Sequence, residues 1–212
     1  MISANDPHQG QPLRVAGRDA REAEAAMILV HGRGGTAEEI LGLAERLEHD
    51  DFCFLAPQAA GRTWYPLRFL SPLEENEPYL SSALRVLDRL FEQLAAAGIP
   101  AARVFLLGFS QGACLALEWA ARNARRYGGV AGLSGGLIGP PGRDFAFEGR
   151  LAGTEVFLGC SDVDPHIPLE RVEKTALVLG DLGGRVTKRI YPGMGHTINA
   201  DEIEHVRGMM SP

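Results

Sequence analysis

Two segments of the chain match the pattern G-x-S-x-G, in which a serine hydroxyl can act as a nucleophile. They are GFSQG at residues 108–112 and GLSGG at residues 132–136. The pattern alone is a weak signal, because chance matches are not rare in a chain with 26 glycines. Nucleophilic chemistry also needs a sharp strand-to-helix turn, which holds the serine hydroxyl exposed at the edge of a sheet. The flanking sequence therefore has to separate the two serines.

Ser110 has the flanking sequence that such a turn requires. It follows the apolar run VFLLG and precedes ACLALEWAAR, which has the pattern of a buried helix. Ser134 also follows an apolar run, but the GLIGPP after it cannot start a helix, so we interpret Ser134 as a tight strand end. The N-terminus of a helix favours negative charge, which suits an oxyanion intermediate. We predict Ser110 as the nucleophile and the amide of Gln111 as one oxyanion donor.

The glycine-rich loop HGRGG at residues 31–35 is a candidate for the second oxyanion donor. It follows the apolar run AAMILV, and this kind of serine site takes its second amide from the loop after an early strand. Glycines let the backbone approach a ligand closely. We predict the amide of Arg33 as this donor. No Gly-Lys-Ser/Thr follows, so a phosphate loop is excluded, whereas a plain flexible connection stays open as the alternative.

A serine nucleophile needs a base and an orienting acid, which follow here in the order serine, acid, histidine. Three of the six histidines precede Ser110, and His205 lies in a helical pattern. His166 is too close to the acidic residues to come from a separate strand end. His196 remains, in the glycine-rich stretch PGMGHTIN between a strand pattern and the last helical pattern. Catalytic groups of open α/β sheets collect at such strand ends, so we predict His196 as the base.

The acid must lie between Ser110 and His196, after another strand. The strand pattern TEVFLG leads directly into CSDVDPHIP, which holds Asp162, Asp164 and His166 close together. The order of the chain puts this loop in the right place, but it leaves open which aspartate is the acid. The three side chains could also be metal ligands, in which case a chelator would abolish activity.

The positions of these residues follow from an alternation of strand and helix patterns. Uninterrupted apolar strands of this kind indicate a parallel sheet covered by helices on both faces. We predict one domain over residues 1–212, with a peripheral N-terminal segment at 1–24 and a long loop at 136–149. The strands are expected at 25–30, 52–57, 104–108, 127–133, 154–159 and 185–192, and the helices around 36–47, 80–94, 113–122, 168–181 and 199–209.

Composition narrows the class of protein. The net charge is -6 and no basic stripe occurs, which gives no reason to expect nucleic acid. The three cysteines are widely spaced and form no CxxC pair, which argues against disulfides and a structural zinc site and fits a reducing compartment. No apolar run is long enough to cross a bilayer, and the N-terminus lacks the apolar run of a secretory signal. We expect a soluble, cytoplasmic protein without membrane insertion.

Four motifs together resemble a known family. HGRGG, GFSQG, DPHIPL and GMGHT are similar, in this order, to the motifs of the α/β-hydrolase family of phospholipases, carboxylesterases and acyl-protein thioesterases. The resemblance spans residues 25–205 and implies an α/β-hydrolase fold with a mostly parallel sheet and no large lid domain. Matching the motifs residue by residue implies a Ser110, Asp164 and His196 triad, with oxyanion amides on Arg33 and Gln111. It implies no metal and no organic cofactor.

The chain departs from the family pattern at two places. Cys160-Ser161 replaces the H-G that usually precedes the acidic loop, and HGRGG replaces the commoner H-G-L-G-D, which puts a cation beside the oxyanion region. The segment TWYPLRF at 63–69 resembles the tryptophan-containing segment near the family's active site. We predict an acyl pocket lined by apolar side chains on these loops, namely Trp64, Tyr65, Leu67, Phe69, Leu137, Ile138 and Met194.

The sequence therefore predicts a serine carboxylesterase that acts on small or medium acyl and aryl esters through an acyl-enzyme. A small-molecule ester is the expected partner, and a homodimer is an open alternative to a monomer. Three other interpretations remain: an acyl-protein thioesterase or lysophospholipase with a longer acyl channel, a noncatalytic hydrolase-like binding protein, and a dienelactone-hydrolase-like enzyme. The last normally has cysteine at position 110, and serine there argues against it.

Overall fold

The computed structural model describes residues 6–211. Its centre is a seven-stranded sheet in the order β1-β3-β2-β4-β5-β6-β7. β1 is antiparallel to β3, and every other neighbouring pair is parallel. The strands are β1 (Leu13–Gly17), β2 (Ala25–Val30), β3 (Phe52–Pro57), β4 (Val104–Phe109), β5 (Gly129–Leu133), β6 (Glu155–Ser161) and β7 (Arg185–Tyr191).

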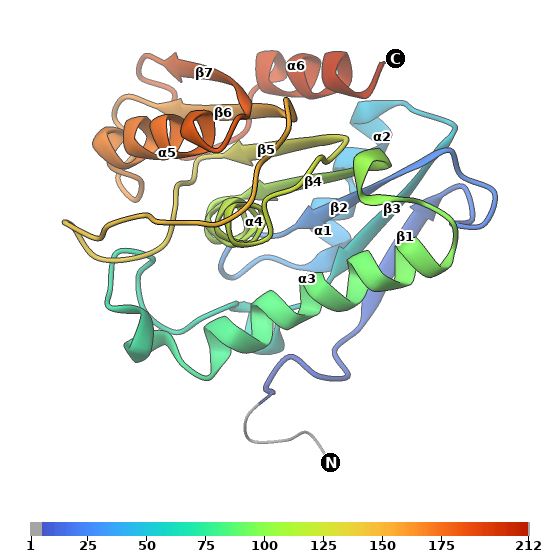
Figure 1. Cartoon of the computed structure of the whole chain (residues 1–212), viewed down its shortest axis with the longest axis horizontal. Coiled ribbons are helices and arrows are strands. Elements are labelled where there is room, and N and C mark those ends of the chain that lie inside the picture. The colour runs from blue at the N-terminus through green and yellow to red at the C-terminus, as the bar shows by residue number, and fades with distance from the viewer. Residues whose placement is uncertain (1–5, 212) are drawn as a thin grey trace.

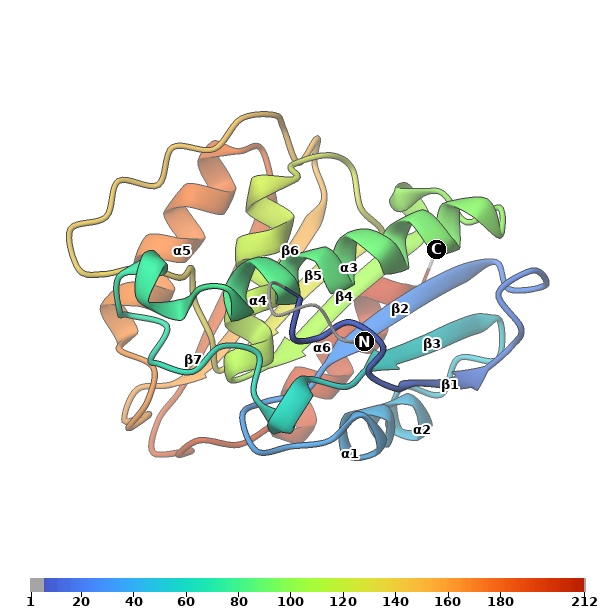
Figure 2. The same ribbon diagram turned by 90° about the horizontal axis from the view of Figure 1, so that it is seen from below.

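Helices cover both faces of this sheet. One face carries α1 (Ala37–Leu41), α2 (Leu43–Leu47) and α6 (Ala200–Met210), and the other carries α3 (Tyr79–Ala96), α4 (Gln111–Arg122) and α5 (Leu169–Asp181). Figure 1 shows the sheet between α6 on one side and α3 and α4 on the other, and Figure 2 shows α3, α4 and α5 in front of the strands. Short 3-10 helices occupy Ala60–Arg62, Leu73–Asn76 and Ala101–Arg103.

The strands are apolar along their whole length because both of their faces are buried. All six residues of β2 are buried, and successive side chains point to opposite faces of the sheet. Ile28 packs in the core beneath α3, α4 and α5, whereas Met27 and Leu29 pack in the core beneath α1, α2 and α6. This two-sided burial explains why the sequence shows continuous apolar runs in place of alternation.

The predicted fold class is confirmed, and the observed elements lie within a few residues of the predicted ones. Two differences have clear local causes. β1 has no predicted counterpart, because its half-exposed LRVAG sequence lacks the apolar run of a buried strand. The predicted helix at 36–47 is two short helices, since the chain is interrupted at Gly42, which is the C-cap of α1 and the N-cap of α2.

The N-terminal segment lies at the edge of the sheet, where β1 pairs with β3. Residues 1–5 and 212 of the predicted domain lie outside the described residues. The long connection predicted at 136–149 is part of the loop between β5 and β6, and no separate lid domain stands over the sheet within residues 6–211. No helix in the described chain combines the length and apolar character needed to cross a membrane.

Candidate active site

Ser110 lies in the turn between β4 and α4. Its backbone has φ 56° and ψ -120°, a strained conformation for a residue with a side chain. The two glycines of the motif make this turn possible, because the backbone packs against them so closely that a side chain would not fit. A Cβ on Gly108 would lie 2.3 Å from the carbonyl oxygen of Gly112, and a Cβ on Gly112 would lie 2.2 Å from that of Val30. The motif therefore lets α4 start directly against the end of β2.

Three of the predicted residues meet around this turn. The Oγ of Ser110 lies 2.8 Å from Nε2 of His196, and Nδ1 of His196 lies 2.7 Å from Oδ2 of Asp164. Asp164 follows β6, and His196 lies in the loop between β7 and α6. The carboxylate of Asp164 is fully buried, while the side chain of His196 is 18% exposed. The serine, the imidazole and the carboxylate are thus linked by two consecutive hydrogen bonds, which run from the cavity into the protein.

The surroundings of Asp164 keep its carboxylate ionised. Oδ1 accepts hydrogen bonds from the backbone N–H groups of His166 at 2.8 Å and Ile167 at 3.1 Å. Burial raises the pKa of Asp164, but the hydrogen bond with His196 and these two backbone bonds outweigh burial and hold the pKa below its ordinary value. A carboxylate held in this way orients the imidazole that it contacts.

The second aspartate of the loop has a different position. Oδ1 of Asp162 accepts a hydrogen bond of 2.8 Å from the N–H of Gly193, and Oγ of Ser161 accepts one of 3.2 Å from the N–H of Gly195. Both bonds join the aspartate loop to the loop of His196. The sequence indicates no role for Ser161, because a serine beside an aspartate gives no distinctive signal. Asp162 and Ser161 support the turn that carries the imidazole.

His166 lies on the rim of the same site. Its ring packs edge-on against that of His196, with 4.8 Å between the ring centres, and it lines the cavity over Ser110. Among residues 6–211, no three His, Cys, Asp or Glu side chains lie together so as to hold a metal ion. Asp162, Asp164 and His166 are therefore three separate positions in the loop, with three different sets of contacts.

The two predicted oxyanion donors flank Ser110. Gln111 is the first residue of α4, so its N–H has no acceptor within the helix. The N–H of Arg33 lies in the loop after β2 and has no hydrogen-bond acceptor among the described residues. The loops come together closely, since a Cβ on Gly32 would lie 3.2 Å from Cβ of Ser110. Both amides are available for a ligand beside the serine.

A cavity of about 610 Å³ opens over Ser110. The predicted pocket residues Tyr65, Leu67 and Phe69 line it. Arg68 also lines it, and its side chain makes no ion pair with another of the residues 6–211. The full lining consists of Arg33, Tyr65, Pro66, Leu67, Arg68, Phe69, Ser71, Ser110, Gln111, Cys114, His166, Ile167 and His196.

Four residues predicted to line the pocket lie elsewhere, and the prediction is wrong for them. Trp64, Leu137 and Ile138 are fully buried in the core, and none of the three lines the cavity. Met194 is half-buried, and its sulfur accepts a hydrogen bond of 2.8 Å from Nδ2 of Asn199. A large apolar residue on a loop near an active site can face the core as readily as the site. Sequence position alone does not distinguish the two orientations.

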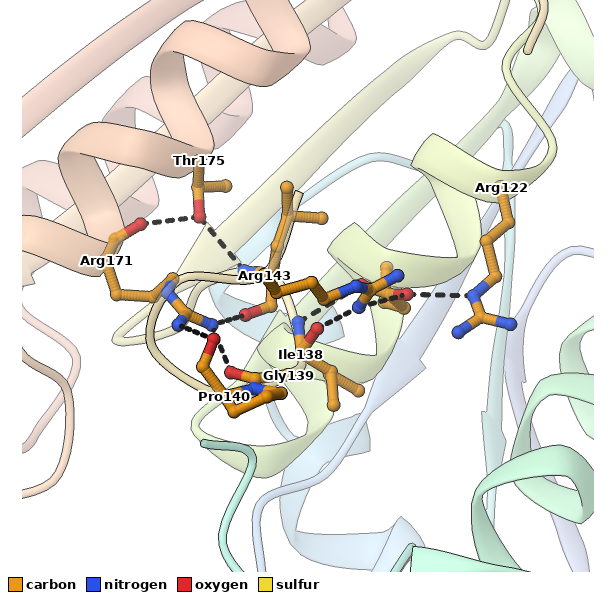
Figure 3. Close-up of polar contacts among 9 residues, drawn as sticks. Arg122, Ile138, Gly139, Pro140, Arg143, Arg171 and Thr175 are labelled. Carbon is orange, nitrogen blue, oxygen red and sulfur yellow. Dashed lines mark hydrogen bonds and ion pairs between the residues drawn. The ribbon is translucent and has the colours of Figure 1, made fainter. Parts of the chain in front are cut away.

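A buried glutamate and its arginine partners explain the inward position of Ile138. The carboxylate of Glu118 in α4 is fully buried and accepts a hydrogen bond of 3.1 Å from the N–H of Ile138. It also pairs with Arg122 at 2.8 Å and Arg143 at 3.0 Å. Figure 3 shows Arg122, Ile138 and Arg143 of this cluster. The backbone of the loop is thereby tied to the helix that follows Ser110.

Arg171 holds the same loop from α5. Its guanidinium donates to the carbonyl oxygens of Leu137 at 2.6 Å, Gly139 at 2.8 Å and Pro140 at 3.2 Å. Figure 3 shows Arg171 pointing at Gly139 and Pro140. The N–H of Gly139 in turn donates to the carbonyl oxygen of Phe69 at 2.7 Å. The network therefore fixes the wall of the cavity at Phe69 without contributing an apolar lining side chain of its own.

Ser134, the serine of the second motif, lies outside the site. It follows β5 directly at φ 52°, and its N–H donates to the carbonyl oxygen of Gly159 at 2.7 Å. The side chain is fully buried, and its Oγ has no hydrogen-bond partner among the described residues. The interpretation of Ser134 as a tight strand end agrees with this position.

The fold and the position of Ser110 after a central strand define an α/β-hydrolase. The family model described as Phospholipase/Carboxylesterase matches residues 14–211, and the chain belongs to this family. The resemblance stated from the four motifs is thus confirmed.

Individual relatives agree with the family assignment. The chain is 33% identical to acyl-protein thioesterase 1 of Yarrowia lipolytica over 205 residues, which cover 86% of this chain and 88% of the relative. Acyl-protein thioesterase 1 of Gibberella zeae is 27% identical over 216 residues, with 90% and 91% covered. The crystal structure of a phospholipase/carboxylesterase from Dyadobacter fermentans superposes with a TM-score of 0.91 at 39% identity, with 95% and 96% covered. The chain is therefore an esterase or thioesterase of the α/β-hydrolase superfamily.

Proposed function

We propose that this chain is a serine carboxylesterase that hydrolyses small or medium acyl and aryl esters through a covalent acyl-serine. The observation that carries the proposal is the pair of hydrogen bonds that links Ser110 to His196 and His196 to Asp164. Ser110 lies at the floor of a cavity. The serine is within hydrogen-bond reach of the histidine, and the histidine is within hydrogen-bond reach of the aspartate, which is the geometry that nucleophilic catalysis requires.

The first half-reaction forms the acyl-enzyme. Oγ of Ser110 attacks the carbonyl carbon of the ester while Nε2 of His196 takes the hydroxyl proton. The oxyanion of the tetrahedral intermediate accepts hydrogen bonds from the N–H groups of Arg33 and Gln111. Its collapse breaks the bond to the leaving alcohol, which receives the proton from His196. The acyl group stays on Ser110 as an ester.

The second half-reaction releases the acid. Water enters where the alcohol left, and His196 takes a proton from it as it attacks the acyl carbonyl. Collapse of this second intermediate returns the proton to Oγ of Ser110 and frees the carboxylic acid. Throughout, Asp164 accepts the hydrogen bond from Nδ1 of His196, which keeps Nε2 directed at the serine and stabilises the imidazolium.

The cavity supports a small or medium substrate. Its volume of about 610 Å³ lies within the range of roughly 300–1,000 Å³ typical of small-molecule sites. The apolar side chains of Tyr65, Leu67 and Phe69 provide one wall for an acyl or aryl group. A short acyl chain can pack against this wall and does not need a longer apolar channel.

A thioesterase acting on longer acyl chains is the second candidate. The observation in its favour is that the curated relatives at 27% and 33% identity are named acyl-protein thioesterases. The same triad hydrolyses a thioester by the same steps, with a thiol as the leaving group. The two candidates differ in the acyl chain that the cavity accepts and in the leaving group.

A series of p-nitrophenyl esters from acetyl to palmitoyl tests the proposal on wild type, Ser110→Ala and Ser134→Ala. We expect hydrolysis of the short esters by wild type and by Ser134→Ala, and its loss in Ser110→Ala. Equal hydrolysis by wild type and Ser110→Ala would refute the serine mechanism. A preference for palmitoyl substrates, together with faster cleavage of an S-palmitoyl peptide than of the matching ester, would favour the thioesterase.

A further inference from the structure

The side chain of Arg33 grips one short segment of the chain through four hydrogen bonds. Nη1 donates to Oγ1 of Thr63 at 3.3 Å and to the carbonyl oxygen of Pro66 at 2.9 Å. Nη2 donates to the carbonyl oxygens of Tyr65 at 2.9 Å and Leu67 at 2.6 Å. All four acceptors are uncharged, so the guanidinium is held by backbone and hydroxyl oxygens alone. We call residues 63–67 the template segment.

The side chain of the other oxyanion residue binds the same segment. Oε1 of Gln111 accepts a hydrogen bond of 2.9 Å from the N–H of Trp64, and Nε2 donates to the carbonyl oxygen of Tyr65 at 2.8 Å. The carbonyl of Tyr65 thus accepts from both Gln111 and Arg33. Two residues that lie far apart in the chain are coupled through one peptide group.

Two further hydrogen bonds join the loop after β2 to the residues around the template segment. The N–H of Gly34 donates to the carbonyl oxygen of Arg62 at 2.8 Å, next to the template segment. Nε1 of Trp64 donates to the carbonyl oxygen of His31 at 2.8 Å. The amide of Arg33 therefore lies between two points where its loop is bonded to the residues around the template segment.

The loop that carries this amide has one backbone hydrogen bond of its own, from the N–H of Gly35 to the carbonyl oxygen of Gly32 at 3.1 Å, and its other bonds to the template region are made with residues outside the loop. HGRGG has three glycines, belongs to no helix or strand, and has Gly34 at φ 79°. Glycine gives the backbone more conformational freedom than any other residue. An oxyanion donor is effective only when it is fixed at the position where the negative charge develops. A planar guanidinium with several fixed donors suits a set of carbonyl oxygens, whereas a lysine ammonium has three donors at one nitrogen.

We propose that Arg33 is a positioning residue. Its guanidinium binds the template segment, which Gln111 also binds, and thereby holds the two oxyanion amides at a fixed separation. The proposal rests on the proposed serine-hydrolase function and assigns the arginine side chain a role in it. The backbone amide of Arg33 binds the oxyanion, and its side chain holds that amide in place. Arg33 thus acts on kcat through the template segment.

The kinetic test compares Arg33→Met, Arg33→Lys and a matched control, Arg46→Ala. Arg46 is an exposed arginine of α2 whose side chain makes no ion pair with another of the residues 6–211. With a short p-nitrophenyl ester, we expect kcat to fall by about 10- to 100-fold in Arg33→Met, with KM within about threefold. A transition-state analogue such as a short alkyl boronic acid should lose affinity in proportion. The control should stay within about twofold on both measures.

Arg33→Lys separates positioning from charge. Lysine keeps the positive charge but cannot reach four acceptors in fixed directions, so we expect kcat to fall at least about half as far as in Arg33→Met on a logarithmic scale. Full activity in Arg33→Lys would overturn the proposal, because charge alone would then suffice. Wild-type kcat and boronate affinity in Arg33→Met would overturn it as well.

Hydrogen exchange provides a measurement that does not depend on activity. We expect amides of the template segment, including those of Trp64 and Leu67, to exchange about 10-fold faster or more in Arg33→Met than in wild type or Arg46→Ala. Unchanged exchange would contradict the proposal even in an active enzyme. Failure of the serine mechanism is recognised separately, by activity that survives in Ser110→Ala while the exchange of the template segment still depends on Arg33.

Discussion

The two G-x-S-x-G segments lie at the ends of neighbouring strands of the same sheet and share more than their sequence pattern. β4 and β5 are parallel, and Gly108 of the first segment is paired with Gly132 of the second. Ser110 has φ 56° and Ser134 has φ 52°, so both serines have the strained backbone expected of a tight turn. The N–H of Ser110 even donates to the carbonyl oxygen of Leu133, next to Ser134. Strain therefore does not distinguish them.

The two serines differ in the element that comes after each of them and in the groups that face each hydroxyl. α4 begins directly after Ser110, whereas a loop without a helix comes after Ser134. The hydroxyl of Ser110 meets His196 at the edge of a cavity, and the hydroxyl of Ser134 is fully buried without a hydrogen-bond partner among residues 6–211. Under the proposed function only Ser110 reacts, because a helix start and a base meet its turn and neither of them meets the turn of Ser134.

Removing each hydroxyl in turn should produce the largest contrast. We expect Ser110→Ala to lower kcat/KM by roughly 10⁴-fold or more, because the nucleophile itself is lost. Ser134→Ala should leave kcat/KM within about threefold, since that hydroxyl is buried and unbonded. Rates with p-nitrophenyl acetate give both values. A loss of similar size in the two variants would show that the second motif takes part in the reaction.

The two aspartates of the loop after β6 offer the next contrast. Asp164→Asn removes the carboxylate that orients His196 and should lower kcat by about 10³- to 10⁴-fold. Asp162→Asn keeps an oxygen that can accept the hydrogen bond from Gly193, so we expect a loss of less than about 10-fold. The measurement is kcat at saturating substrate for both variants. A greater loss in Asp162→Asn would assign the acid to the other aspartate.

Substitution of the last glycine of each motif should destabilise the protein to a different extent. A Cβ on Gly112 would lie 2.2 Å and 2.5 Å from the carbonyl oxygens of Val30 and His31, which are backbone atoms of the core. A Cβ on Gly136 would meet side-chain atoms, with Cγ of Arg171 at 2.8 Å. We expect Gly112→Ala to cost about 3 kcal/mol or more of unfolding free energy and Gly136→Ala about 1 kcal/mol. Thermal denaturation compares them, and equal losses would contradict the close packing of α4.

The smallest expected effect is a pH dependence of stability, which comes from the buried carboxyl of Glu202 behind the second motif. A Cβ on Gly159, whose carbonyl accepts the N–H of Ser134, would lie 2.1 Å from Oε1 of Glu202. Oε1 of Glu202 has no hydrogen-bond partner among the described residues, and burial raises the pKa of this carboxyl from 4.5 to about 7. The folded protein therefore keeps the proton at a pH where the unfolded chain releases it.

The pH dependence of stability follows from this shift. Between about pH 4.5 and 7 the folded state binds more protons than the unfolded state, so unfolding free energy decreases as pH rises through this range. Glu202→Gln keeps an oxygen for the N–H of Asn199 and cannot ionise. We expect the wild type to lose about 1–3 kcal/mol relative to Glu202→Gln between about pH 5 and pH 7.5. Urea denaturation at both pH values measures the difference, and parallel pH profiles would exclude the shifted carboxyl.

Much of the molecule could be predicted from the sequence, because local patterns and chain order carry the relevant signals. Continuous apolar runs reflect strands buried on both faces, so the parallel sheet and its helices were predictable. The helical run after Ser110 separated the two serines. The order of strand ends located the loop of Asp164 and the loop of His196, since parallel strands end at one edge of the sheet.

Other features depend on contacts between residues that are distant in the chain, so local sequence patterns do not predict them. Which of Asp162 and Asp164 is the acid depends on which carboxylate contacts His196, and that carboxylate belongs to Asp164. The inward position of Trp64 and Leu137 depends on hydrogen bonds with Gln111, His31 and Arg171 that no local pattern reveals. The edge strand β1 depends on pairing with β3, because its own sequence is half-exposed and only weakly apolar.

Arg33 combines both kinds of information. Its place in a glycine-rich loop after an early strand is a local feature, and from it the sequence predicts the amide of Arg33 as an oxyanion donor. The direction of its side chain is set by four oxygens that lie 30 to 34 residues further along the chain. Those oxygens come within reach only when the sheet is assembled, so no local pattern in the sequence predicts that this charged side chain holds its own loop in place.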